Sequence, residues 1–374
     1  MQRIYLDANA TTPLDPRVRE AMVAWLDAGN ASSPHAEGRA ARAAIDDARE
    51  KVATLIGAAP REIIFTSGAT EANAIALLGS IRARGMRKVA CTAVEHPSVL
   101  RALQSLQPSL ELSLLAVDSL GRLDDACALP EGVELVSIMR ANNETGTILP
   151  VGAIARRAHE LGAVVHCDAV QACGKIPVDV DELAADLVAL SAHKMCGPKG
   201  AGALYVRQGT RIEPLVHGGE HERGLRPGTE NVAAIVGLGA AAEFALRETA
   251  SRATLWRELT SHFTERLEGE LAGVRINSPR EERVANTVSI TFSDVEGEAV
   301  LLGLDLAGIA VATGSACSSG AAEPSHVLRA LGHSRAEAEN SIRVSLHPSN
   351  TREEIDACVH SLVRVVNKLR TLAV

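Results

Sequence analysis

Residues 187–200 read LVALSAHKMCGPKG, and this stretch decides which kind of fold the chain can adopt. The apolar run 187–190 stops at Ser191 and is followed by Lys194 and a turn that is rich in glycine and proline. A short continuous apolar run bounded by turn residues is typical of a strand that is buried on both faces of a sheet. Ligands bind beyond the carboxyl ends of such strands. We therefore predict that Lys194 stands at a ligand-binding edge.

Runs of the same kind recur between residues 38 and 210, and helical patterns separate them. The expected strands are residues 62–65, 88–93, 112–117, 134–139, 164–167, 187–190 and 203–206. The expected helices are residues 38–55, 70–83, 98–106 and 151–160. This alternation indicates the α/β class, with a mixed, mostly parallel sheet that is flanked by helices.

An Ala- and Glu-rich stretch, about residues 233–271, predicts helices that lead to a smaller α+β unit. In that unit we expect strands near 286–292 and 342–346 and helices near 298–306 and 351–369. A chain of 374 residues suggests about two domains. We predict a large domain over residues 14–250 and a small domain formed by residues 1–13 and 251–374.

Composition argues against several classes of protein. The net charge of −8 argues against bulk electrostatic binding to nucleic acid. No apolar run is long enough for a membrane span, and the first residues lack the pattern of a signal peptide. The seven cysteines include no Cys-x-x-Cys pair, which argues against a disulfide framework or a metal site and favours a reducing cytoplasm.

Asp168 follows the expected strand 164–167, within HCDAVQ at 166–171. A Schiff-base cofactor needs a lysine to form the imine and an anionic partner to keep the pyridine nitrogen protonated. Lys194 and Asp168 could supply both parts. The alternatives are that Lys194 is a solvated surface residue and that Asp168 caps a helix.

Residues 66–73, TSGATEAN, lie between the expected strand 62–65 and a helix. Backbone N–H groups at a helix start, together with small hydroxyl side chains, bind phosphate. An ordinary helix N-cap is the alternative. Glu71 is an anion near this expected anion site, so it must point away or bond to a protein partner.

Three further residues carry reactive or charged groups. Cys317 lies in ATGSACSSG at 312–320, where small neighbours predict an exposed loop; an inert cysteine is the alternative, which only the presence of the cofactor motifs disfavours. His96 follows the strand 88–93 and could stack on a planar ring and transfer protons, or be a satisfied loop histidine. Arg343 falls inside an apolar strand and needs a partner, either a substrate carboxylate or an internal acid.

Together, these motifs resemble the cysteine desulfurases, which are pyridoxal-phosphate enzymes of fold type I with an aspartate-aminotransferase-like large domain. The resemblance runs nearly end to end, and the loop from Cys317 to His326 is similar to the long-loop group typical of iron–sulfur cluster assembly. The motifs that carry it are YLDANATTP (5–13), NASSPH (30–35), SGATEAN (67–73), EHP (95–97), NNETG (142–146), HCDAVQ (166–171), SAHK (191–194), RPGTEN (226–231) and ACSS (316–319).

The resemblance implies a role for each matching residue. Lys194 would hold pyridoxal 5'-phosphate as an imine, Asp168 would pair with the ring nitrogen, and His96 would stack on the ring. The remaining contacts implied are Gln171 and Asn143 on the ring-hydroxyl side, Ala69, Thr70, Ser191 and His193 on the phosphate, Thr229 from the neighbouring subunit of a homodimer, and Arg343 with Asn30 on the substrate carboxylate.

The implied function is a cytoplasmic transferase that removes sulfur from L-cysteine, gives L-alanine, and leaves a persulfide on Cys317. A sulfur-acceptor protein, such as an iron–sulfur scaffold, would then take the sulfur. An aminotransferase or a selenocysteine lyase would need Lys194 but not necessarily Cys317. A non-catalytic scaffold protein is a third alternative, against which the intact Lys194, Asp168 and Cys317 argue. The chain departs from the family pattern at Glu220-His221, at Cys196 and at His347.

Overall fold

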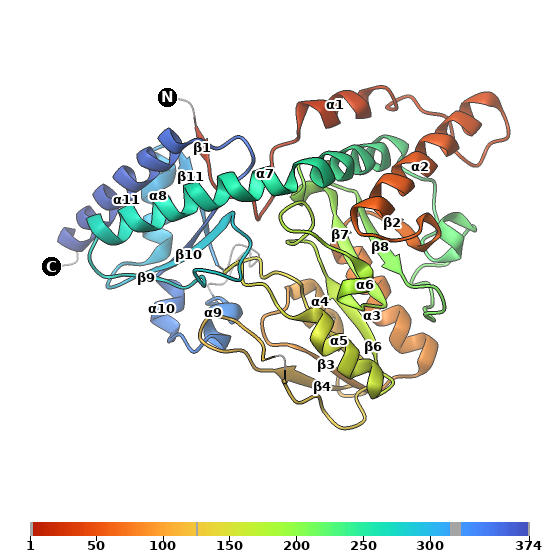
Figure 1. Ribbon diagram of the computed structural model, residues 1–374, viewed down its shortest axis with the longest axis horizontal. Coiled ribbons are helices and arrows are strands. Elements are labelled where there is room, and N and C mark those ends of the chain that lie inside the picture. Colours follow the sequence, from red (N-terminus) through yellow and green to blue (C-terminus); the bar gives the residue numbers. More distant parts are fainter. Residues whose placement is uncertain (1–2, 125, 315–322, 373–374) are drawn as a thin grey trace.

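The computed structural model describes residues 3–124, 126–314 and 323–372, so that Cys317 lies outside the described residues. Figure 1 shows a larger unit built on one sheet and a smaller unit beside it, with the long helix α7 (Val232–Glu270) running along both. The N-terminal and C-terminal ends both lie at the smaller unit.

The larger unit contains a seven-stranded sheet with the order β2-β8-β7-β6-β5-β3-β4. Strand β8 pairs antiparallel with β2 and β7, and the other pairs are parallel. The predicted strands and the mixed, mostly parallel sheet are therefore confirmed. The strands are β2 (Ile63–Thr66), β3 (Lys88–Thr92), β4 (Glu111–Leu115), β5 (Leu135–Ser137), β6 (Val164–Asp168), β7 (Leu187–Ser191) and β8 (Gly202–Val206).

Side chains of one strand enter the core on both faces of this sheet. On β7, Val188 and Leu190 pack in one apolar cluster with residues of α2 and α5, whereas Leu187 and Ala189 pack in another with residues of α3 and α4. This explains why the strand sequence is continuously apolar rather than alternating. The helices are α2 (Ala36–Leu55), α3 (Ala69–Arg84), α4 (Pro97–Gln104), α5 (Val151–Glu160) and α6 (Val180–Leu183).

Helix α1 (Pro16–Val23) and the short strand β1 (Ile4–Tyr5) were not expected from the sequence. Val18 is the only residue of α1 that is buried, so the helix shows no apolar stripe. Strand β1 has two residues, too few to show a period, and it pairs with β11 (Ile309–Ala310).

Residues 233–271 were expected to form several helices, and they form the single helix α7 of 39 residues. Its first part, including Leu238 and Ala242, packs in the core of the larger unit. Its second part, including Phe263 and Leu267, packs in the core of the smaller unit. One helix thus passes through the predicted boundary at residue 250, and the domain division stays a prediction.

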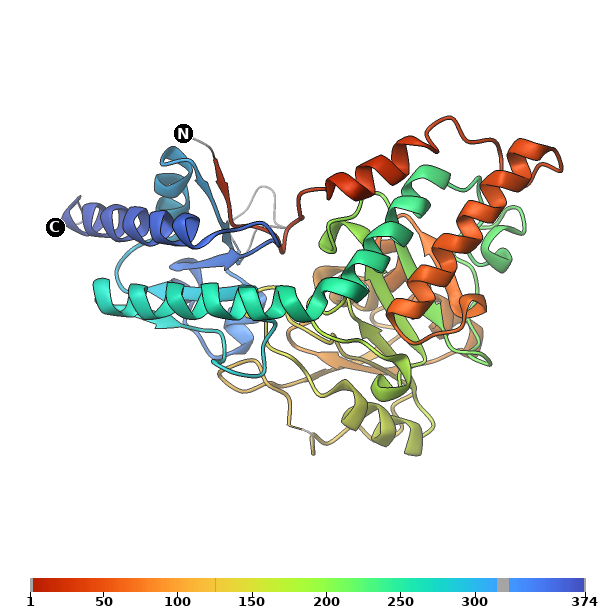
Figure 2. The ribbon, with the colours of Figure 1, turned by 45° about the horizontal axis from the view of Figure 1, so that its top comes forward.

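The smaller unit contains an antiparallel sheet with the order β12-β13-β10-β9, covered by α8 and α11. Residues 6–12 continue from β1 past this sheet toward the larger unit, as Figure 2 shows. Asp7 bridges to Ser345, and the amide of Thr12 then donates to the carbonyl of His193. The elements are β9 (Val274–Ile276), β10 (Thr287–Phe292), α8 (Gly297–Leu306), β12 (Ala312–Thr313), α9 (His326–Ala330), α10 (Arg335–Glu339), β13 (Ser341–Ser345) and α11 (Arg352–Leu372).

Within the described part of the chain, no helix combines the length and the apolar character that crossing a membrane requires.

Two glycines of α7 test how closely it packs on α2. A methyl group on Gly239 would lie 2.6 Å from the Cα atom of Ala48, whereas a methyl group on Gly269 meets nothing within 4 Å. We expect Gly239→Ala to lower the free energy of unfolding by about 1–3 kcal/mol through overpacking. Gly269→Ala should raise it by about 0.5 kcal/mol, because alanine favours the helix. Urea and thermal unfolding measure both; an equal or higher stability of Gly239→Ala would contradict the close α2–α7 contact.

Candidate active site

A cavity of about 1010 Å³ lies at the carboxyl ends of the central parallel strands and the start of α3, and residues of the smaller unit close its other side. This is the edge at which the sequence predicted a ligand site. The cavity brings together most of the predicted site residues: Ala69, Thr70, His96, Asn143, Asp168, Gln171, Ser191, His193, Lys194 and Arg343.

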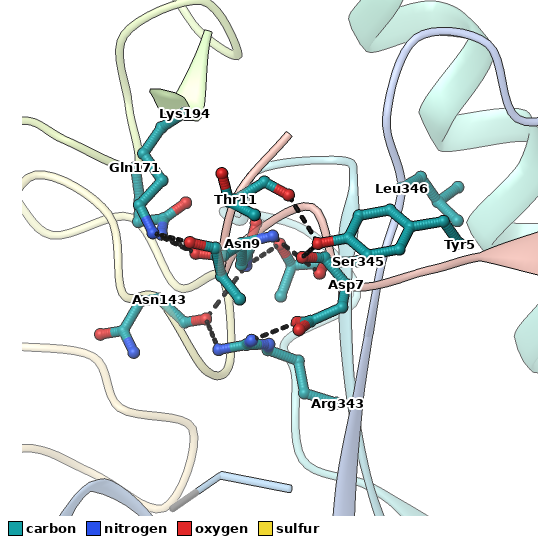
Figure 3. Close-up of polar contacts among 12 residues, drawn as sticks. Tyr5, Asp7, Asn9, Thr11, Asn143, Gln171, Lys194, Arg343, Ser345 and Leu346 are labelled. Atoms are coloured by element: carbon teal, nitrogen blue, oxygen red, sulfur yellow. Dashed lines mark hydrogen bonds and ion pairs between the residues drawn. The ribbon is translucent and has the colours of Figure 1, made fainter. Parts of the chain in front are cut away.

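Lys194 ends the short 3₁₀ turn Ala192–Lys194 that directly follows β7. Its Nζ donates to the carbonyl oxygens of Asn9 and Ala10 at 2.6 and 2.7 Å, as Figure 3 shows for Asn9. The side chain is therefore directed into the cavity edge by the N-terminal segment and not toward bulk solvent. This arrangement argues against the alternative of a solvated surface lysine.

Asn9 is buried and connects the two units. Its Oδ1 accepts from Lys175 Nζ at 2.7 Å and from Asn286 Nδ2 at 3.2 Å. Its Nδ2 donates to the Asn143 carbonyl at 3.0 Å and to Thr287 Oγ1 at 2.8 Å. Asn9 belongs to the motif YLDANATTP, but its role could not be predicted, because a lone asparagine in a loop carries no signal of its long-range partners.

Asp168 ends β6 and is buried at the cavity wall. Its Oδ1 accepts from the Val170 amide at 3.0 Å, and its Oδ2 accepts from Asn73 Nδ2 at 2.9 Å. The carboxyl group is therefore held in one orientation by two N–H donors, as a partner for a ring nitrogen must be. The hydrogen bond from the backbone N–H of Val170 also fits the alternative that Asp168 caps a helix, so the role of Asp168 as partner of a ring nitrogen stays a prediction.

His96 caps helix α4, since its Nδ1 accepts from the Ser98 amide at 3.1 Å. Burial lowers the pKa of His96; the charge of Asp168 opposes this effect, and that of Lys194 adds to it. The charges of Asp168 and Lys194 therefore have opposite effects on the pKa of the imidazole. The ring is neutral at neutral pH and is free to lie against a planar ligand.

The residues around the start of α3 fit a phosphate group. Gly68 precedes the helix with φ +154° and ψ 176°, a conformation that essentially only glycine adopts. Ser191 Oγ is buried at the cavity and has no hydrogen-bond partner among the described residues. A buried hydroxyl without a partner is costly, and a phosphate oxygen would supply one. A phosphorylated cofactor therefore fits these residues.

Glu71 lies in the first turn of α3, and its carboxylate bonds to protein partners. Its Oε1 accepts from Arg226 Nε at 3.1 Å, and its Oε2 accepts from the Ser67 amide. Burial raises the pKa of Glu71, but the bonds from Ser67 and Arg226 outweigh this, and the pKa lies below its usual value. The conflict that the sequence raised is thus resolved by pairing.

Arg343 lies on β13 and is buried. Its Nη2 pairs with Asp7 Oδ1 at 2.6 Å, and its Nη1 donates to the Asn143 carbonyl at 3.1 Å (Figure 3). The internal ion pair that the sequence left open is therefore present. Arg343 also lines the cavity, and its Nε has no hydrogen-bond partner among the described residues. The guanidinium is held by Asp7 and still has a donor to offer.

Two buried acids near the cavity, Glu144 and Glu95, could not be identified as such from the sequence. Glu144 receives a hydrogen bond from Ser325, and burial raises its pKa to about 7. Glu95 receives hydrogen bonds from Thr92 Oγ1 and the Met139 amide, and burial raises its pKa to about 8. Glu144 lies in the quoted NNETG motif and Glu95 precedes His96, but only tertiary packing shows that they are buried.

Two predicted residues, Thr229 and Asn30, do not line this cavity. Thr229 lines a second, smaller cavity of about 190 Å³ with Glu222 and Arg226. Asn30 is exposed in the loop between α1 and α2, where it accepts from the Ser32 amide. Cys317 lies outside the described residues. The roles assigned to Asn30, Thr229 and Cys317 stay predictions.

The structure shows the environment of two residues that depart from the family pattern, His221 and Cys196. His221 approaches Ser32 Oγ at 3.2 Å and Glu230 at 3.8 Å, so it joins the Asn30 loop to the second cavity. Cys196 is buried, and burial raises its pKa, which favours a packing residue over a second reactive thiol. Among residues 3–124, 126–314 and 323–372, no group of three or more His, Cys, Asp or Glu side chains could hold a metal ion.

The comparisons with known proteins agree with this geometry. Residues 4–358 match the family Aminotransferase class-V. Cysteine desulfurase IscS of Dictyoglomus turgidum is 45% identical over 381 residues, which covers 100% of this chain and 96% of that protein. A solved NifS-like protein has a TM-score of 0.92 at 38% identity, covering 98% of this chain and 100% of that chain. The structure of SspA in complex with cysteine has a TM-score of 0.81 at 34% identity, covering 93% of this chain and 100% of that chain. The chain therefore belongs to the class-V aminotransferase family and, within it, to the pyridoxal-phosphate-dependent cysteine desulfurases.

Proposed function

We propose that this chain takes sulfur from L-cysteine in the large cavity, with Lys194, Asp168 and Cys317 as the groups that carry the reaction. The observation that supports this most directly is one cavity edge that gathers Lys194, Asp168 and a neutral His96 beside a phosphate-binding helix start. The similarity to desulfurases, rather than to aminotransferases that act on other substrates, favours cysteine as the substrate.

Pyridoxal 5'-phosphate, when bound, supplies an electron sink for the carbanion that forms at the substrate Cα atom. Asp168 would face its ring nitrogen, and His96 would lie against the ring. Its phosphate would contact the helix start at Ala69 and Thr70, together with Ser191 and His193. Gln171 and Asn143 would contact the ring-hydroxyl side. The unpartnered Ser191 hydroxyl supports this placement.

Lys194 is proposed to anchor the cofactor and then, once the substrate amine has displaced it, to take the proton from the substrate Cα atom. A base must lie within hydrogen-bond reach of the proton that it removes. The carbonyls of Asn9 and Ala10 hold the Lys194 amine at the cavity edge, so the displaced side chain keeps a defined position.

Arg343 is proposed to bind the substrate carboxylate, with Asn30 assisting. Asp7 fixes the guanidinium, Arg343 lines the cavity, and its Nε has no hydrogen-bond partner among the described residues. The related SspA was solved in complex with cysteine, which supports cysteine as the ligand proposed for this site. Charge-assisted hydrogen bonds to the carboxylate would set the orientation of the substrate.

Cys317 is proposed to attack the substrate sulfur as a thiolate. A bond forms between the two sulfur atoms, the substrate Cβ–Sγ bond breaks, and Cβ takes a proton, so that alanine leaves and a persulfide remains. Gly314 and Glu323, which flank the segment containing Cys317, both line the cavity. Their position supports a thiol within reach of the substrate.

A homodimer in the cytoplasm, with Thr229 of one subunit completing the phosphate site of the other, is also part of the proposal. Thr229 does not line the cavity of its own chain, which is compatible with a role toward a neighbour. The described cysteines are all free thiols, as in a reducing compartment. The sulfur acceptor would be a protein such as an iron–sulfur scaffold.

The lysine assignment is tested with Lys194→Ala. Purified wild-type protein with pyridoxal phosphate should show the absorbance of the Schiff base, and the variant should lose this band and its alanine production. Lys199→Ala is the matched control, because Lys199 lines the same cavity but no role in the Schiff base is assigned to it. If Lys194→Ala retained the band, another residue would hold the cofactor.

The thiol assignment is tested with Cys317→Ala. This variant should keep the cofactor band and bind cysteine, yet form no alanine under physiological reductant, because no thiolate accepts the sulfur. Mass spectrometry of wild-type protein after incubation with cysteine should find one additional sulfur on Cys317. Cys127→Ala, at a partly exposed thiol outside the cavity, should turn over normally. Normal turnover by Cys317→Ala would remove this residue from the mechanism.

The arginine assignment is tested with Arg343→Ala, which should lower kcat/KM for cysteine roughly 10- to 100-fold. This range corresponds to the loss of about 1.5–3 kcal/mol from hydrogen bonds to a charged group. Arg352→Ala, at the start of α11 and outside the cavity, should leave kcat/KM unchanged. If a folded Arg343→Ala variant kept its kcat/KM, the ion pair with Asp7 would be the whole role of Arg343.

A further inference from the structure

A series of buried polar side chains, joined by hydrogen bonds, lies behind Asp168, and the proposed reaction does not use it. It begins at Ser137 on β5 and passes to His166 on β6, where Ser137 Oγ and His166 Nδ1 lie 2.8 Å apart. His166 Nε2 lies 3.0 Å from Asn73 Oδ1 on α3. Asn73 Nδ2 then bonds to Asp168 Oδ2 at 2.9 Å. This series of hydrogen bonds thus leads from Ser137 on β5 to Asp168 at the cavity wall.

Asn73 also has a second branch. Its Nδ2 lies 2.9 Å from Ser98 Oγ, and Ser98 Oγ lies 2.8 Å from His96 Nδ1. The side-chain NH₂ group of Asn73 is therefore bonded directly to Asp168 and, through the hydroxyl of Ser98, to His96. Asn73 itself is 0% exposed, so water cannot replace either bond.

The donor and the acceptor of each hydrogen bond follow from the number of hydrogens and lone pairs that each side chain offers. The carboxylate of Asp168 accepts, so Asn73 must present its NH₂ group there, and the second hydrogen of that group goes to Ser98 Oγ. Asn73 Oδ1 then accepts from His166. Burial lowers the pKa of His166 to about 4, so the ring carries one proton, which is on Nε2. Its Nδ1 accepts from the Ser137 hydroxyl.

The same reasoning fixes the protonation of His96. Ser98 Oγ accepts from Asn73 and therefore donates its own hydrogen to His96 Nδ1, which also accepts from the Ser98 amide. The single proton of the neutral imidazole is then on Nε2. A rotated Asn73 amide would place Oδ1 against the Asp168 carboxylate and would leave Asp168 Oδ2 without this donor, so the reverse arrangement is disfavoured.

We infer that Asn73 is a positioning residue for the cofactor ring, which holds Asp168 at the ring nitrogen and, through Ser98, His96 against the ring, while His166 and Ser137 hold Asn73 itself. The inference rests on the proposed assignments of Asp168 and His96. It adds that the two groups are set by one buried amide rather than independently. Hydrogen bonds from the protein thus fix both the direction of the Asp168 carboxylate and the tautomer of His96.

The test is a pH titration of the Schiff-base absorbance in the holoenzyme without substrate, together with the dissociation constant of pyridoxal phosphate. In Asn73→Ala the carboxyl group of Asp168 loses a donor and its fixed direction, so the ring nitrogen is less protonated and the Schiff-base nitrogen becomes more basic. The titration midpoint should move to higher pH. The cofactor should dissociate at roughly tenfold higher concentration, as expected for one lost hydrogen bond to a charged group.

Leu77→Ala is the matched control. Leu77 is one helical turn beyond Asn73 on the same face of α3 and is equally buried, but it packs in an apolar cluster. It should lower the unfolding temperature without moving the titration midpoint. His166→Leu and Ser137→Ala should move the midpoint in the same direction as Asn73→Ala, by less, and they keep the test decisive if Asn73→Ala does not fold.

Asp168→Ala separates the inference from the proposal on which it rests. If Asp168→Ala leaves the midpoint unchanged, the assignment of Asp168 to the ring nitrogen is wrong. If Asp168→Ala moves the midpoint but Asn73→Ala, His166→Leu and Ser137→Ala do not, or move it no more than Leu77→Ala does, then only the positioning role is wrong.

Discussion

The active site depends on the hydrogen bonds that the buried N-terminal segment makes around Asn9. The carbonyl of Asn9 accepts from Lys194 and Gln171, and its side chain bonds to Lys175, Asn143 and Thr287 of β10. A buried polar group that loses its partner costs free energy, so each of these bonds helps to hold the segment in place. Segment 5–12 therefore fixes the smaller unit against the edge of the large sheet and gives the lysine its place.

The charges at this edge are arranged so that each has a defined partner. Arg343 is neutralised by Asp7, Glu71 by Arg226, and Asp168 accepts from two N–H groups. In a buried site such pairing avoids the high cost of an isolated charge. Among the described residues that line the cavity, the buried side-chain atoms without a hydrogen-bond partner are the Ser191 hydroxyl and the Nε of Arg343. These are the groups that a phosphate and a carboxylate would satisfy.

The fold explains why these groups meet. In the parallel part of the sheet, β5, β6 and β7 all end at the same edge, so Asp168 and the turn carrying Lys194 come from neighbouring strands. Helix α3 begins at that edge and presents its first N–H groups there. The smaller unit, packed around the second part of α7, brings Arg343 to the open side, where His326 at the start of α9 also lines the cavity. A cofactor bound between the units would contact both.

The strands of the large sheet and the placement of several site residues could be predicted from local sequence patterns. The apolar runs predicted every strand of the large sheet to within a few residues, and the polar residues at the run ends predicted the placement of Asp168, Lys194 and the phosphate-binding helix start. Such signals are local: burial on both faces requires a continuous apolar run, and a strand ends where the run ends. The motif order indicated the family without any coordinates.

Other features could not be read in this way. The partner of Arg343, the bonds of Asn9 and Lys175, and the chain from Ser137 through His166 and Asn73 to Asp168 join residues far apart in the sequence. The continuity of α7 across residue 250 depends on two separate cores that bury its two parts. Periodicity and residue chemistry are properties of neighbouring residues, so the class of fold and the candidate reactive groups could be predicted from the chain alone. The pairing of polar groups in a buried site depends on distances between segments far apart in the chain, so it is visible only after folding.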